Sequence, residues 1–563
     1  MFERHFRVWP KGLPRELTLP ATSLYFNLEV SAARYPDKPF LIFYGAPLTY
    51  REFKRQADAL AGFLQRDCGV NKGDRVLLYL QNSPQFMIAF YAVLRADAVA
   101  VPVSPLNLTG ELRRFAADSG ARIAITGQEL LERAAPLLLD AGPDGKLERV
   151  IVAAYCDYAD GAADPALPQA VSAPRAKIDL PGAIAWSEAL AAGRVPGPHT
   201  AAPDDLCVMP YTSGTTGRPK GCMHTHRTVM STVLAGQLWA FSGASADSVV
   251  LCSLPLFHVT AMQSGMNGPM YMGQTVVLMQ RWERDAAARL IERHRVTAWT
   301  NIATMAVDFL ANPQIGKYDL SSLRRIGGGG AAMPAAVAKK LFELTGLEYI
   351  EGYGLSETMA PSHANPPEAP KRQCLGVPIF GVDCRVIDPD TLTELGPGET
   401  GEIVIRGPQV FLGYWNNPEA TEAAFIEIEG ERFFRSGDLG RYDEDGYFFM
   451  VDRLKRMINA SGMKVWPAEV ESVMYSHPGI QEACVIAARD GYRGETVKAL
   501  VVLKPEARGK IAPEEIIGWC RQHMAAYKYP RIVELADSLP HSATGKVQWR
   551  LLQERESGAP SKE

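Results

Sequence analysis

The stretch YTSGTTGRPKG, from Tyr211 to Gly221, consists almost entirely of small and hydroxylated residues around one lysine. Its two central glycines allow backbone angles that are closed to other residues, so main-chain N–H groups can approach a ligand closely. The hydroxyls add further donors, and Lys220 adds a mobile cation. Such a set suits phosphate oxygens, because a charge-assisted hydrogen bond contributes about 1.5–3 kcal/mol. One interpretation of the stretch is therefore a phosphate-binding loop.

The spacing differs from that of the Walker phosphate loop, G-x-x-x-x-G-K-[ST], because two residues separate Gly217 from Lys220. Taken alone, the stretch is explained equally well as a plain turn rich in Gly and Thr. Other segments shift this balance, although each has an ordinary structural explanation by itself. They are GYGLSET (Gly352 to Thr358), RSGDL (Arg435 to Leu439), DRLKRMI (Asp452 to Ile458) and HSATGK (His541 to Lys546).

In this order, the five motifs closely resemble those of the adenylate-forming (AMP-binding) superfamily of acyl-CoA ligases, firefly-type luciferases and peptide-synthetase adenylation domains. The resemblance covers nearly the whole chain, from LTYREF (Leu48 to Phe53) to TGKVQWRLL (Thr544 to Leu552). It implies an enzyme that activates a carboxylic acid with ATP and Mg²⁺ to an acyl-adenylate, and then passes the acyl group to coenzyme A. The segment FFMVDRLKRMINASGMKVWPAEVE most resembles the corresponding segment of bacterial medium- and long-chain fatty acyl-CoA ligases.

Residue roles in nucleotide binding follow from this resemblance. Glu357 is expected to help hold Mg²⁺, together with Thr216, and to take part in catalysis. Asp438 is expected to bind the ribose hydroxyls, assisted by Arg453. The other expected nucleotide contacts are Thr212, Ser213, Gly214, Thr215, Thr216 and Lys220 for the phosphates, Gly352, Tyr353 and Gly354 for adenine, and Ser356 for the α-phosphate.

The resemblance also implies that the small C-terminal domain moves between the two half-reactions. Lys546 is expected to be the main catalytic residue of adenylation, because a cation offsets the repulsion between a carboxylate and a triphosphate. Lys455 matches the hinge at which the family rotates its small C-terminal domain. The loop Ser461-Gly462-Met463 is then expected to form part of the coenzyme A tunnel. The family often carries an aromatic residue where Met463 stands, so this chain departs from the pattern there.

Two segments bear on the acid. His258, in PLFHV, matches a family position near the acyl carboxylate, and Met262, Met266 and Met270 follow at the spacing of one helical face. Such a methionine stripe is more often ordinary core than a ligand surface, and flexible thioethers would suit an aliphatic chain if it faces the ligand. Pro269 is expected to break that helix before the third methionine. In the Gly-rich strand RIGGGGAAM, the expected acyl-pocket wall has no bulk and lacks the Trp of acetate ligases. The wall residues are Gly328, Gly329, Gly330 and Ala331.

A medium- or long-chain fatty acid is thus the favoured substrate. An aryl or arylalkanoic acid is the main alternative, because a glycine-lined slot also admits a ring, and short thioether acids stay open. A peptide-synthetase adenylation domain usually has an Asp where His258-Val259-Thr260-Ala261 stands here. A luciferase-like oxygenase is a second competing class, because it shares the ATP-dependent half-reaction. A non-enzymatic binding module, which has the fold without the chemistry, is the third. The pair His224 and His226 indicates packing rather than a metal site.

Composition and charge further narrow the class of protein and its expected location. With 59 Lys and Arg against 63 Asp and Glu, the net charge of −4 leaves no electrostatic footprint for nucleic acid. The nine scattered cysteines lack any C-x-x-C pair, which indicates free thiols in a reducing compartment. The sequence shows no secretory signal, no peroxisomal S-K-L end and no apolar run of roughly 18–20 residues. We expect a cytoplasmic monomer or homodimer without a membrane span, with peripheral membrane association left open.

At 563 residues the chain exceeds a single core, since cores stop growing at about 250–300 residues. Helical spacing over Phe53 to Cys68 and Gln85 to Leu94 alternates with buried strand patterns over Asp74 to Leu80 and Ala96 to Val103. This alternation predicts α/β layers with largely parallel sheets. The stretch from Asp157 to Pro203, rich in Ala, Pro and Gly, is expected to be irregular.

The pattern of residue types changes after Gly381. β-Branched and aromatic runs between Gly, Pro and Asp turns predict a β-subdomain over roughly residues 381–452. We therefore expect an α/β fold with a large N-terminal domain (1–452), made of stacked α/β subdomains plus the β-subdomain, and a small mobile α+β domain (453–563). The small domain is predicted to contain helices Pro467–Tyr475 and Pro513–Met524 and strands Glu482–Ala488 and Val497–Leu503.

Overall fold

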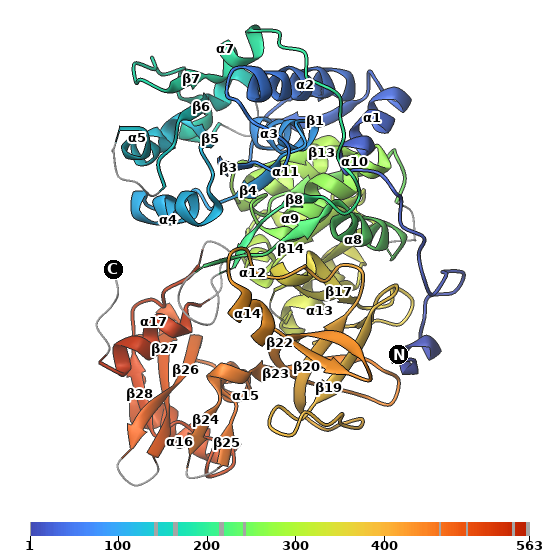
Figure 1. Cartoon of the computed structure of the whole chain (residues 1–563). Coiled ribbons are helices and arrows are strands. Elements are labelled where there is room, and N and C mark those ends of the chain that lie inside the picture. The colour runs from blue at the N-terminus through green and yellow to red at the C-terminus, as the bar shows by residue number, and fades with distance from the viewer. Residues whose placement is uncertain are drawn as a thin grey trace. The chain divides into compact units, whose positions relative to one another are not determined.

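Amphipathic helices and buried strands alternate from the start of the chain, as predicted (Figure 1). Helix α2 (Tyr50–Arg66) begins at Thr49, whose hydroxyl accepts a hydrogen bond from Glu52 N, and it buries the face that carries Phe53 and Leu60. The computed structural model describes residues 2–139, 145–161, 167–212, 219–239, 244–330, 332–460, 463–490, 494–542 and 547–558.

A seven-stranded sheet has the order β11-β8-β4-β3-β5-β6-β7, and all its pairs are parallel except that of β11 with β8. Helices α3 (Pro84–Arg95), α4 (Thr109–Ser119) and α5 (Leu131–Leu139) connect its strands. The strands are β3 (Arg75–Tyr79), β4 (Val99–Pro102), β5 (Ile123–Gly127), β6 (Arg149–Ala153), β7 (Ala183–Ala185), β8 (Leu206–Val208) and β11 (His224–Thr225).

The expectation that residues 157–203 are irregular was partly wrong. Strand β7 pairs in parallel with β6, and α7 (Trp186–Ala191) follows it. Three strand residues between Gly182 and Trp186 are too few to produce a periodic signal, so only the pairing with β6 defines them as a strand.

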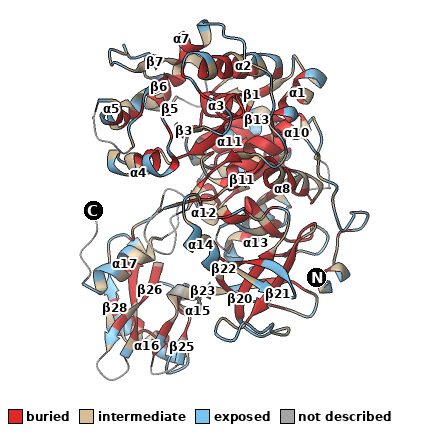
Figure 2. Ribbon diagram, viewed as in Figure 1, coloured by how far each residue is buried: buried red, intermediate tan, exposed pale blue. Residues whose placement is uncertain are grey.

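A nine-stranded sheet has the order β18-β17-β16-β15-β14-β12-β13-β1-β2, with a parallel centre and antiparallel edges. Its strands are β1 (Pro39–Phe43), β2 (Ala46–Thr49), β12 (Val249–Cys252), β13 (Thr275–Leu278), β14 (Ala298–Asn301), β15 (Arg325–Gly329), β16 (Tyr349–Leu355), β17 (Ala360–Ala364) and β18 (Val377–Pro378). The helices around it include α1 (Tyr25–Arg34), α8 (His226–Trp239), α11 (Arg284–His294), α12 (Ala303–Leu310) and α13 (Ala335–Thr345). Figure 2 shows the strands and the inner faces of these helices as the main buried layer.

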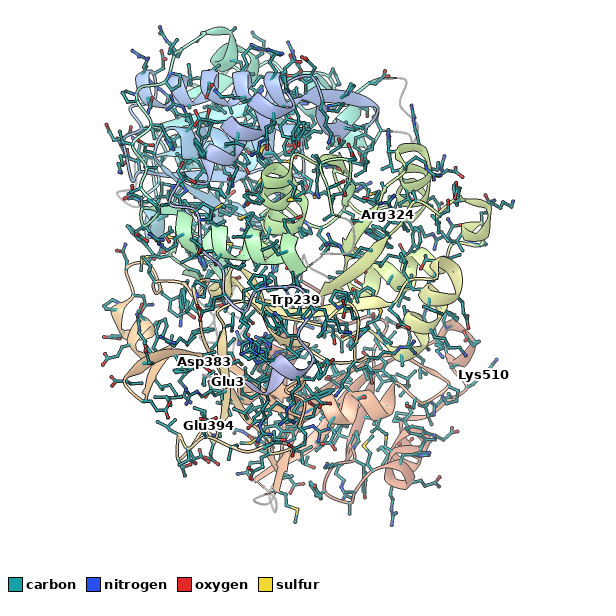
Figure 3. The ribbon with its side chains drawn as sticks, turned by 90° about the vertical axis from the view of Figure 1, so that its right-hand side faces the viewer. Glu3, Trp239, Arg324, Asp383, Glu394 and Lys510 are labelled. Atoms are coloured by element: carbon teal, nitrogen blue, oxygen red, sulfur yellow. The ribbon has the colours of Figure 1, made fainter. Side chains whose placement is uncertain are left out.

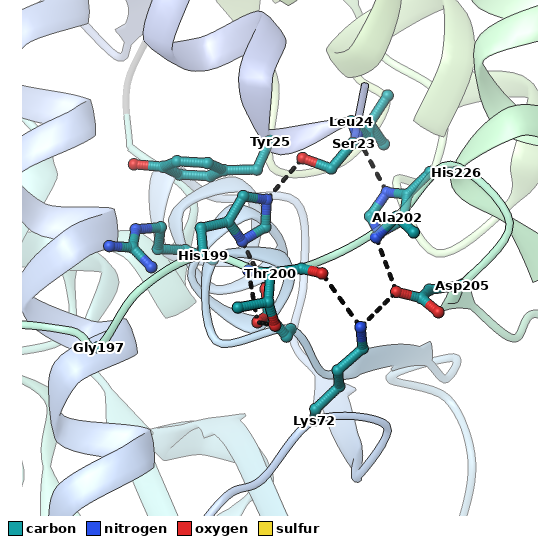
Figure 4. Close-up of polar contacts among 12 residues, drawn as sticks. Ser23, Leu24, Tyr25, Lys72, Gly197, His199, Thr200, Ala202, Asp205 and His226 are labelled. Carbon is teal, nitrogen blue, oxygen red and sulfur yellow. Dashed lines mark hydrogen bonds and ion pairs between the residues drawn. The ribbon is translucent and has the colours of Figure 1, made fainter. Parts of the chain in front are cut away.

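A polar cluster, buried at Ser23 and Asp97 and exposed at Lys72, fixes the connection between α7 and β8 (Figure 4). Nε2 of His199 lies 2.6 Å from the Ser23 hydroxyl, and its Nδ1 lies 2.5 Å from Oδ1 of Asp97. Lys72 reaches both the Thr200 carbonyl, at 3.1 Å, and Oδ2 of Asp205, at 2.7 Å. Asp97 has a φ of +59°, a conformation that short polar side chains tolerate better than others. The cluster thus joins three segments that lie far apart in the sequence.

An aromatic arm precedes α1. Trp9 packs edge-on against Trp239 at 4.9 Å and against Phe380 at 5.3 Å, measured between ring centroids. Phe2 N donates a 2.8 Å hydrogen bond to Oδ1 of Asp383, and Figure 3 shows Glu3 of the arm next to Asp383. The arm is therefore held by residues from distant parts of the sequence.

The chain divides into two compact units, Met1–Cys384 with Ile405–Phe434, and Arg385–Val404 with Arg435–Glu563. Strands β19 (Asp383–Ile387), β20 (Gly401–Arg406) and β22 (Glu431–Tyr442) lie at the division. In the first unit, α14 (Pro418–Ala423) precedes β21 (Phe425–Ile428), which pairs with the beginning of β22. In the second unit, the rest of β22 pairs with β23 (Phe448–Arg453). A rotation boundary at residues 452 and 453 stays a prediction.

The second unit contains the predicted α+β module. Strands β26 (Ile480–Asp490) and β27 (Gly494–Leu503) form its central antiparallel pair, and helices α15 (Pro467–Met474) and α16 (Pro513–His523) occupy the predicted positions. Its remaining elements are η7 (Leu454–Arg456), β24 (Ile458–Ala460), β25 (Met463–Val465), β28 (Ile532–Leu535) and α17 (Trp549–Glu556). Within the described ranges, every helix is too short or too polar to span a lipid bilayer.

Candidate active site

The stem of the expected phosphate loop is a short antiparallel pair. Strand β9 (Tyr211–Thr212) pairs with β10 (Lys220–Gly221), so that Thr212 stands opposite Lys220. The expected contacts Ser213, Gly214, Thr215 and Thr216 lie outside the described residues. The two ends of the stretch are therefore joined, and Lys220 belongs to this joined pair.

The ammonium of Lys220 lies over an aromatic ring. Its Nζ is 4.6 Å from the ring centroid of Tyr414, a residue that the sequence analysis did not identify. A cation over an aromatic face at this distance is attracted by the negative face of the ring. A lone tyrosine in FLGYW carries no motif of its own, and only the fold brings it to Lys220.

Glu357 lies next to the same tyrosine. The Tyr414 hydroxyl donates a 2.9 Å hydrogen bond to Oε1 of Glu357, and Phe411 N donates a 2.9 Å bond to the Glu357 carbonyl. Glu357 is buried, with 8% of its surface exposed, in the turn η6 (Ser356–Thr358) that follows β16. Burial raises the pKa of Tyr414, and the negative charge of Glu357 raises it further. Tyr414 therefore stays protonated and joins the expected phosphate-binding and metal-binding residues.

The two histidines after the loop have separate structural roles. Nε2 of His224 lies 2.8 Å from the Ser356 carbonyl, so His224 supports the turn that carries Ser356 and Glu357. His226 accepts a 3.0 Å hydrogen bond from Leu24 N at its Nδ1. Burial lowers the pKa of each imidazole to about 4. Both histidines are therefore neutral and engaged with different neighbours, in agreement with packing.

The expected adenine-stacking residue, Tyr353, lies on β16. Its ring packs edge-on against His363 of β17, with a centroid distance of 5.6 Å. His363 is buried, and burial lowers its pKa to about 3. Gly354 follows in the same strand, and a Cβ there would lie 2.4 Å from the Ala360 carbonyl oxygen, so only glycine fits.

Glu351, two residues before Tyr353, is a buried carboxylate that the sequence analysis missed. Its Oε1 accepts a 2.8 Å hydrogen bond from Gln373 N, and its Oε2 accepts a 3.3 Å bond from Met333 N. Burial raises its pKa to about 7, while the two amide bonds oppose that shift. Glu351 thereby joins two segments to β16, the strand that carries Tyr353. One segment follows β15 and contains Met333, and the other precedes β18 and contains Gln373.

The interpretation that the Gly-rich strand leaves open room was wrong for two of its positions. A Cβ at Gly328 would lie 1.8 Å from the Asn301 carbonyl oxygen, and one at Gly329 would lie 2.3 Å from the Gly352 carbonyl oxygen. Glycine is required there because the neighbouring strands approach closely. Gly330 has a φ of +86°, which glycine tolerates, and Ala331 lies outside the described residues.

His258 begins the helical segment that follows β12. Its Nδ1 accepts a 3.4 Å hydrogen bond from Thr260 N at the start of α9 (Val259–Ala261). The π-helix η4 (Met262–Asn267) and α10 (Gly268–Met272) continue without interruption, so the expected break at Pro269 was wrong. Pro269 is the second residue of α10, so the change from π- to α-helical hydrogen bonding coincides with the residue that lacks an N–H. Met262, Met266 and Met270 are fully buried in the main core.

The second unit contains the other expected site residues. Nε of Arg453 lies 3.0 Å from Oδ1 of the buried Asp438, and the two residues face each other on β23 and β22. Lys455 lies in η7, and Met463 is 53% exposed on β25. Ser461, Gly462 and Lys546 lie outside the described residues.

Comparison with known proteins places this geometry in a family. The model of the AMP-binding enzyme matches residues 28–415, and the model of the AMP-binding enzyme C-terminal domain matches residues 469–546.

The chain belongs to the AMP-binding enzyme family.

The chain is 34% identical to a long-chain-fatty-acid–CoA ligase of Bacillus subtilis, over 98% of this chain and 97% of the relative. It is 36% identical to a feruloyl-CoA synthase of Amycolatopsis sp., over 89% of this chain and 93% of the relative. Among solved structures, an anthranilate CoA ligase in complex with anthranoyl-AMP matches with a TM-score of 0.81 and 27% identity, over 96% of this chain and 98% of that one.

The protein is thus an AMP-forming acyl-CoA ligase with an α/β fold, as the sequence predicted, and its substrates are a carboxylic acid, ATP and coenzyme A. The usual cofactor of such ligases is Mg²⁺. The described residues contain no group of three or more His, Cys, Asp and Glu side chains placed to hold a metal ion. One buried carboxylate, Glu357, fits Mg²⁺, because this ion prefers one or two carboxylates plus substrate phosphates over an all-protein cage.

Proposed function

We propose that this AMP-binding enzyme activates a medium- or long-chain fatty acid. The observation that supports this substrate most strongly is the extent of the match to long-chain-fatty-acid–CoA ligases, which spans 98% of the chain, against 89% for the feruloyl-CoA synthases.

The adenylation step requires a carboxylate to approach a triphosphate. In our proposal, the loop residues Thr212 to Thr216 and Lys220 bind the β- and γ-phosphates, and Ser356 contacts the α-phosphate. Glu357, oriented by the Tyr414 hydroxyl, would hold Mg²⁺ with Thr216, and the ion would neutralise phosphate charge. Lys546 would bridge the attacking oxygen and the α-phosphate, where negative charge develops.

The adenine and the ribose of the nucleoside would be bound by different residues. Tyr353, flanked by Gly352 and Gly354, would stack on adenine, with its ring fixed from behind by His363. Asp438 would accept hydrogen bonds from the ribose hydroxyls, and Arg453, its ion-pair partner, would assist it.

The acyl-transfer step is proposed to follow a rotation at Lys455. The rotation would withdraw Lys546 and bring Ser461, Gly462 and Met463 to the coenzyme A tunnel. His258 would lie beside the acyl carboxylate, with Met262, Gly328, Gly329, Gly330 and Ala331 along the acyl chain. At Gly328 and Gly329 the wall would be formed by main chain, because neighbouring strands occupy the space of a side chain.

An aryl or arylalkanoic acid is the second candidate. The feruloyl-CoA synthases share 36% identity with the chain, and solved neighbours include anthranilate and benzoate CoA ligases. A main-chain wall also admits a flat ring. Short thioether acids remain a further alternative on the same grounds.

A single assay separates these candidates. Pyrophosphate release would be measured with acids of 4 to about 18 carbons, ferulate, benzoate and a short thioether acid, each with and without coenzyme A. We expect the highest kcat/KM for a fatty acid of about eight carbons or more. Preference for ferulate or benzoate by tenfold or more would contradict the fatty-acid proposal. An adenylate that coenzyme A does not consume would contradict the acyl-transfer step.

We also propose a cytoplasmic location, which the free state of all nine cysteines supports, since disulfides are rare in reducing compartments. A monomer or a homodimer fits the chain, and peripheral membrane association stays open. Size-exclusion chromatography with light scattering, and sedimentation with lipid vesicles, would test these points.

A further inference from the structure

The backbone at Lys455 lies between two anchored arginines of the second unit. Arg453, before it, pairs with Asp438 on β22. Arg456, after it, pairs with Glu471 of α15 and donates a 3.1 Å hydrogen bond to the Val485 carbonyl on β26. Each arginine is thus attached to a different part of the unit, which leaves Leu454 and Lys455 as the residues between the two attachments.

The pair of Arg456 and Glu471 is internal to the module that follows Lys455. Arg456 and Glu471 are mostly buried, with 12% and 15% of their side-chain surfaces exposed. Glu471 also accepts a 2.7 Å hydrogen bond from Val485 N. Because Arg456, Glu471 and Val485 all follow Lys455 in the chain, a rotation at Lys455 would carry them together and leave the contacts among these three unchanged.

Asp452 is different, because its side chain bonds to residues beyond Lys455. It belongs to β23, opposite Leu439 of β22, and only 2% of its surface is exposed. Its Oδ2 accepts a 2.6 Å hydrogen bond from Ala468 N in the first turn of α15. Nη1 of Arg456 lies 3.9 Å from its Oδ1. The carboxylate of Asp452 therefore joins the strand before Lys455 to the helix after it.

This contact supplies the cap of α15. The N-cap residue of the helix is Trp466, which makes no side-chain capping hydrogen bond. A helix N-terminus leaves backbone N–H groups without intrahelical acceptors and favours negative charge. The carboxylate of Asp452 satisfies one of these groups from outside the helix.

We infer that Asp452 is a positioning residue that holds the segment around Lys455 in one of the two orientations that the two half-reactions require, and this role rests on the rotation proposed above. A rotation in the backbone of Lys455 moves Ala468 along an arc. A hydrogen bond of 2.6 Å is lost after a displacement of about 1 Å. The contact from Asp452 to α15 therefore exists in one orientation and breaks in the other.

The test measures the two half-reactions separately in Asp452→Ala. Adenylation is followed by pyrophosphate release without coenzyme A, and thioester formation is followed from prepared acyl-AMP and coenzyme A. We expect the ratio of the two rates to change by about tenfold, because a hydrogen bond to a charged group is lost from one orientation only. A role in folding alone would lower both rates by the same factor.

The matched control is Glu471→Gln, which weakens the buried ion pair that lies wholly beyond Lys455. We expect a lower melting temperature and a ratio of half-reaction rates within about twofold of the wild type. If Asp452→Ala does not fold, as judged by circular dichroism, Asp452→Asn keeps the volume and one acceptor oxygen. The same change of ratio in smaller degree is expected for it.

An unchanged ratio in the folded Asp452 variant would overturn the inference, and so would an equal change of ratio in Glu471→Gln. The wild type distinguishes this failure from failure of the proposed function. Wild-type enzyme that performs both half-reactions, with an Asp452 variant of unchanged ratio, contradicts the positioning role alone. Wild-type enzyme that lacks either half-reaction contradicts the two-step function and the inference with it.

Discussion

The hydroxyl of Tyr414 donates a 2.9 Å hydrogen bond to Oε1 of Glu357, while the ring of the same tyrosine lies under the ammonium of Lys220 at 4.6 Å. The side chain of Tyr414 therefore contacts a carboxylate through its hydroxyl and a cation through its ring. Both are expected to face the phosphates of ATP, so their mutual placement decides how the developing charge is neutralised.

Tyr414→Phe keeps the ring under Lys220 and removes the hydrogen bond to Glu357. We expect kcat/KM for MgATP to fall about 10- to 100-fold, because the lost bond involves a charged acceptor. The Mg²⁺ concentration for half-maximal rate should rise. The control is Tyr79→Phe, which removes a phenol–carbonyl bond to Asn107 elsewhere in the same unit and should leave kcat/KM within about twofold. Equal losses in the two variants would argue against the role of Tyr414.

Lys546→Ala should nearly abolish pyrophosphate release, by about 100-fold or more, because the cation between two anions is lost. Thioester formation from prepared acyl-AMP should stay within about threefold, since the phosphates that need this cation have already left. Lys510→Ala, an exposed lysine of the same unit, is the control and should affect neither step. Parallel losses in both half-reactions would refute the assignment of Lys546.

Glu351 should make stability depend on pH near neutrality. Its pKa is raised from 4.5 to about 7, so the folded state disfavours the charged form relative to the unfolded state. The stabilisation is full below pH 4.5 and is lost as the pH rises through about 7, amounting to about 3 kcal/mol at most.

Urea unfolding of the wild type and of Glu351→Gln at pH 5 and pH 8 checks this. We expect the wild type to lose more free energy of unfolding between these values than the variant, whose side chain does not titrate. The comparison uses the change with pH, because the amide of Gln faces two N–H donors and lowers stability at every pH. Parallel curves would show that Glu351 is already ionised at pH 5.

Gly329→Ala should destabilise the first unit by about 1–3 kcal/mol, because the new Cβ would lie 2.3 Å from the Gly352 carbonyl oxygen and force strands β15 and β16 apart. KM for ATP should also rise, since β16 carries Tyr353. The control is Gly316→Ala, where a Cβ meets nothing within 4 Å and the change should stay within about 0.5 kcal/mol. A stable Gly329 variant with normal KM would show that the strands can adjust.

The helices and central strands were predictable because their signals are local. Helix α2 and strands β26 and β27 follow directly from residue spacing. The pairing of Thr212 with Lys220 was not predicted, because strands of two residues carry no periodic signal. The continuous helix through Pro269 was not predictable, because a π turn before a proline leaves no periodic signal. Strand β7 was missed because its three residues depend on a neighbour for their conformation.

The sequence indicates candidate site residues only where they stand in motifs. Glu357, Tyr353 and Asp438 stand in recognisable segments, but Tyr414 acts 57 positions away from the carboxylate that it orients. Glu351 looks like any charged residue until the fold buries it against two amides. Such residues take their roles from contacts between distant segments, which spacing along one chain does not encode.

The free thiols have a practical use. All nine cysteines belong to the described residues, and Cys156 alone among them is not buried. A maleimide fluorophore should therefore attach at one native position in the first unit, and Lys510→Cys would add a second position in the other unit. Energy transfer between two dyes at these positions would follow the proposed swing of the C-terminal module in real time, without replacing any native cysteine.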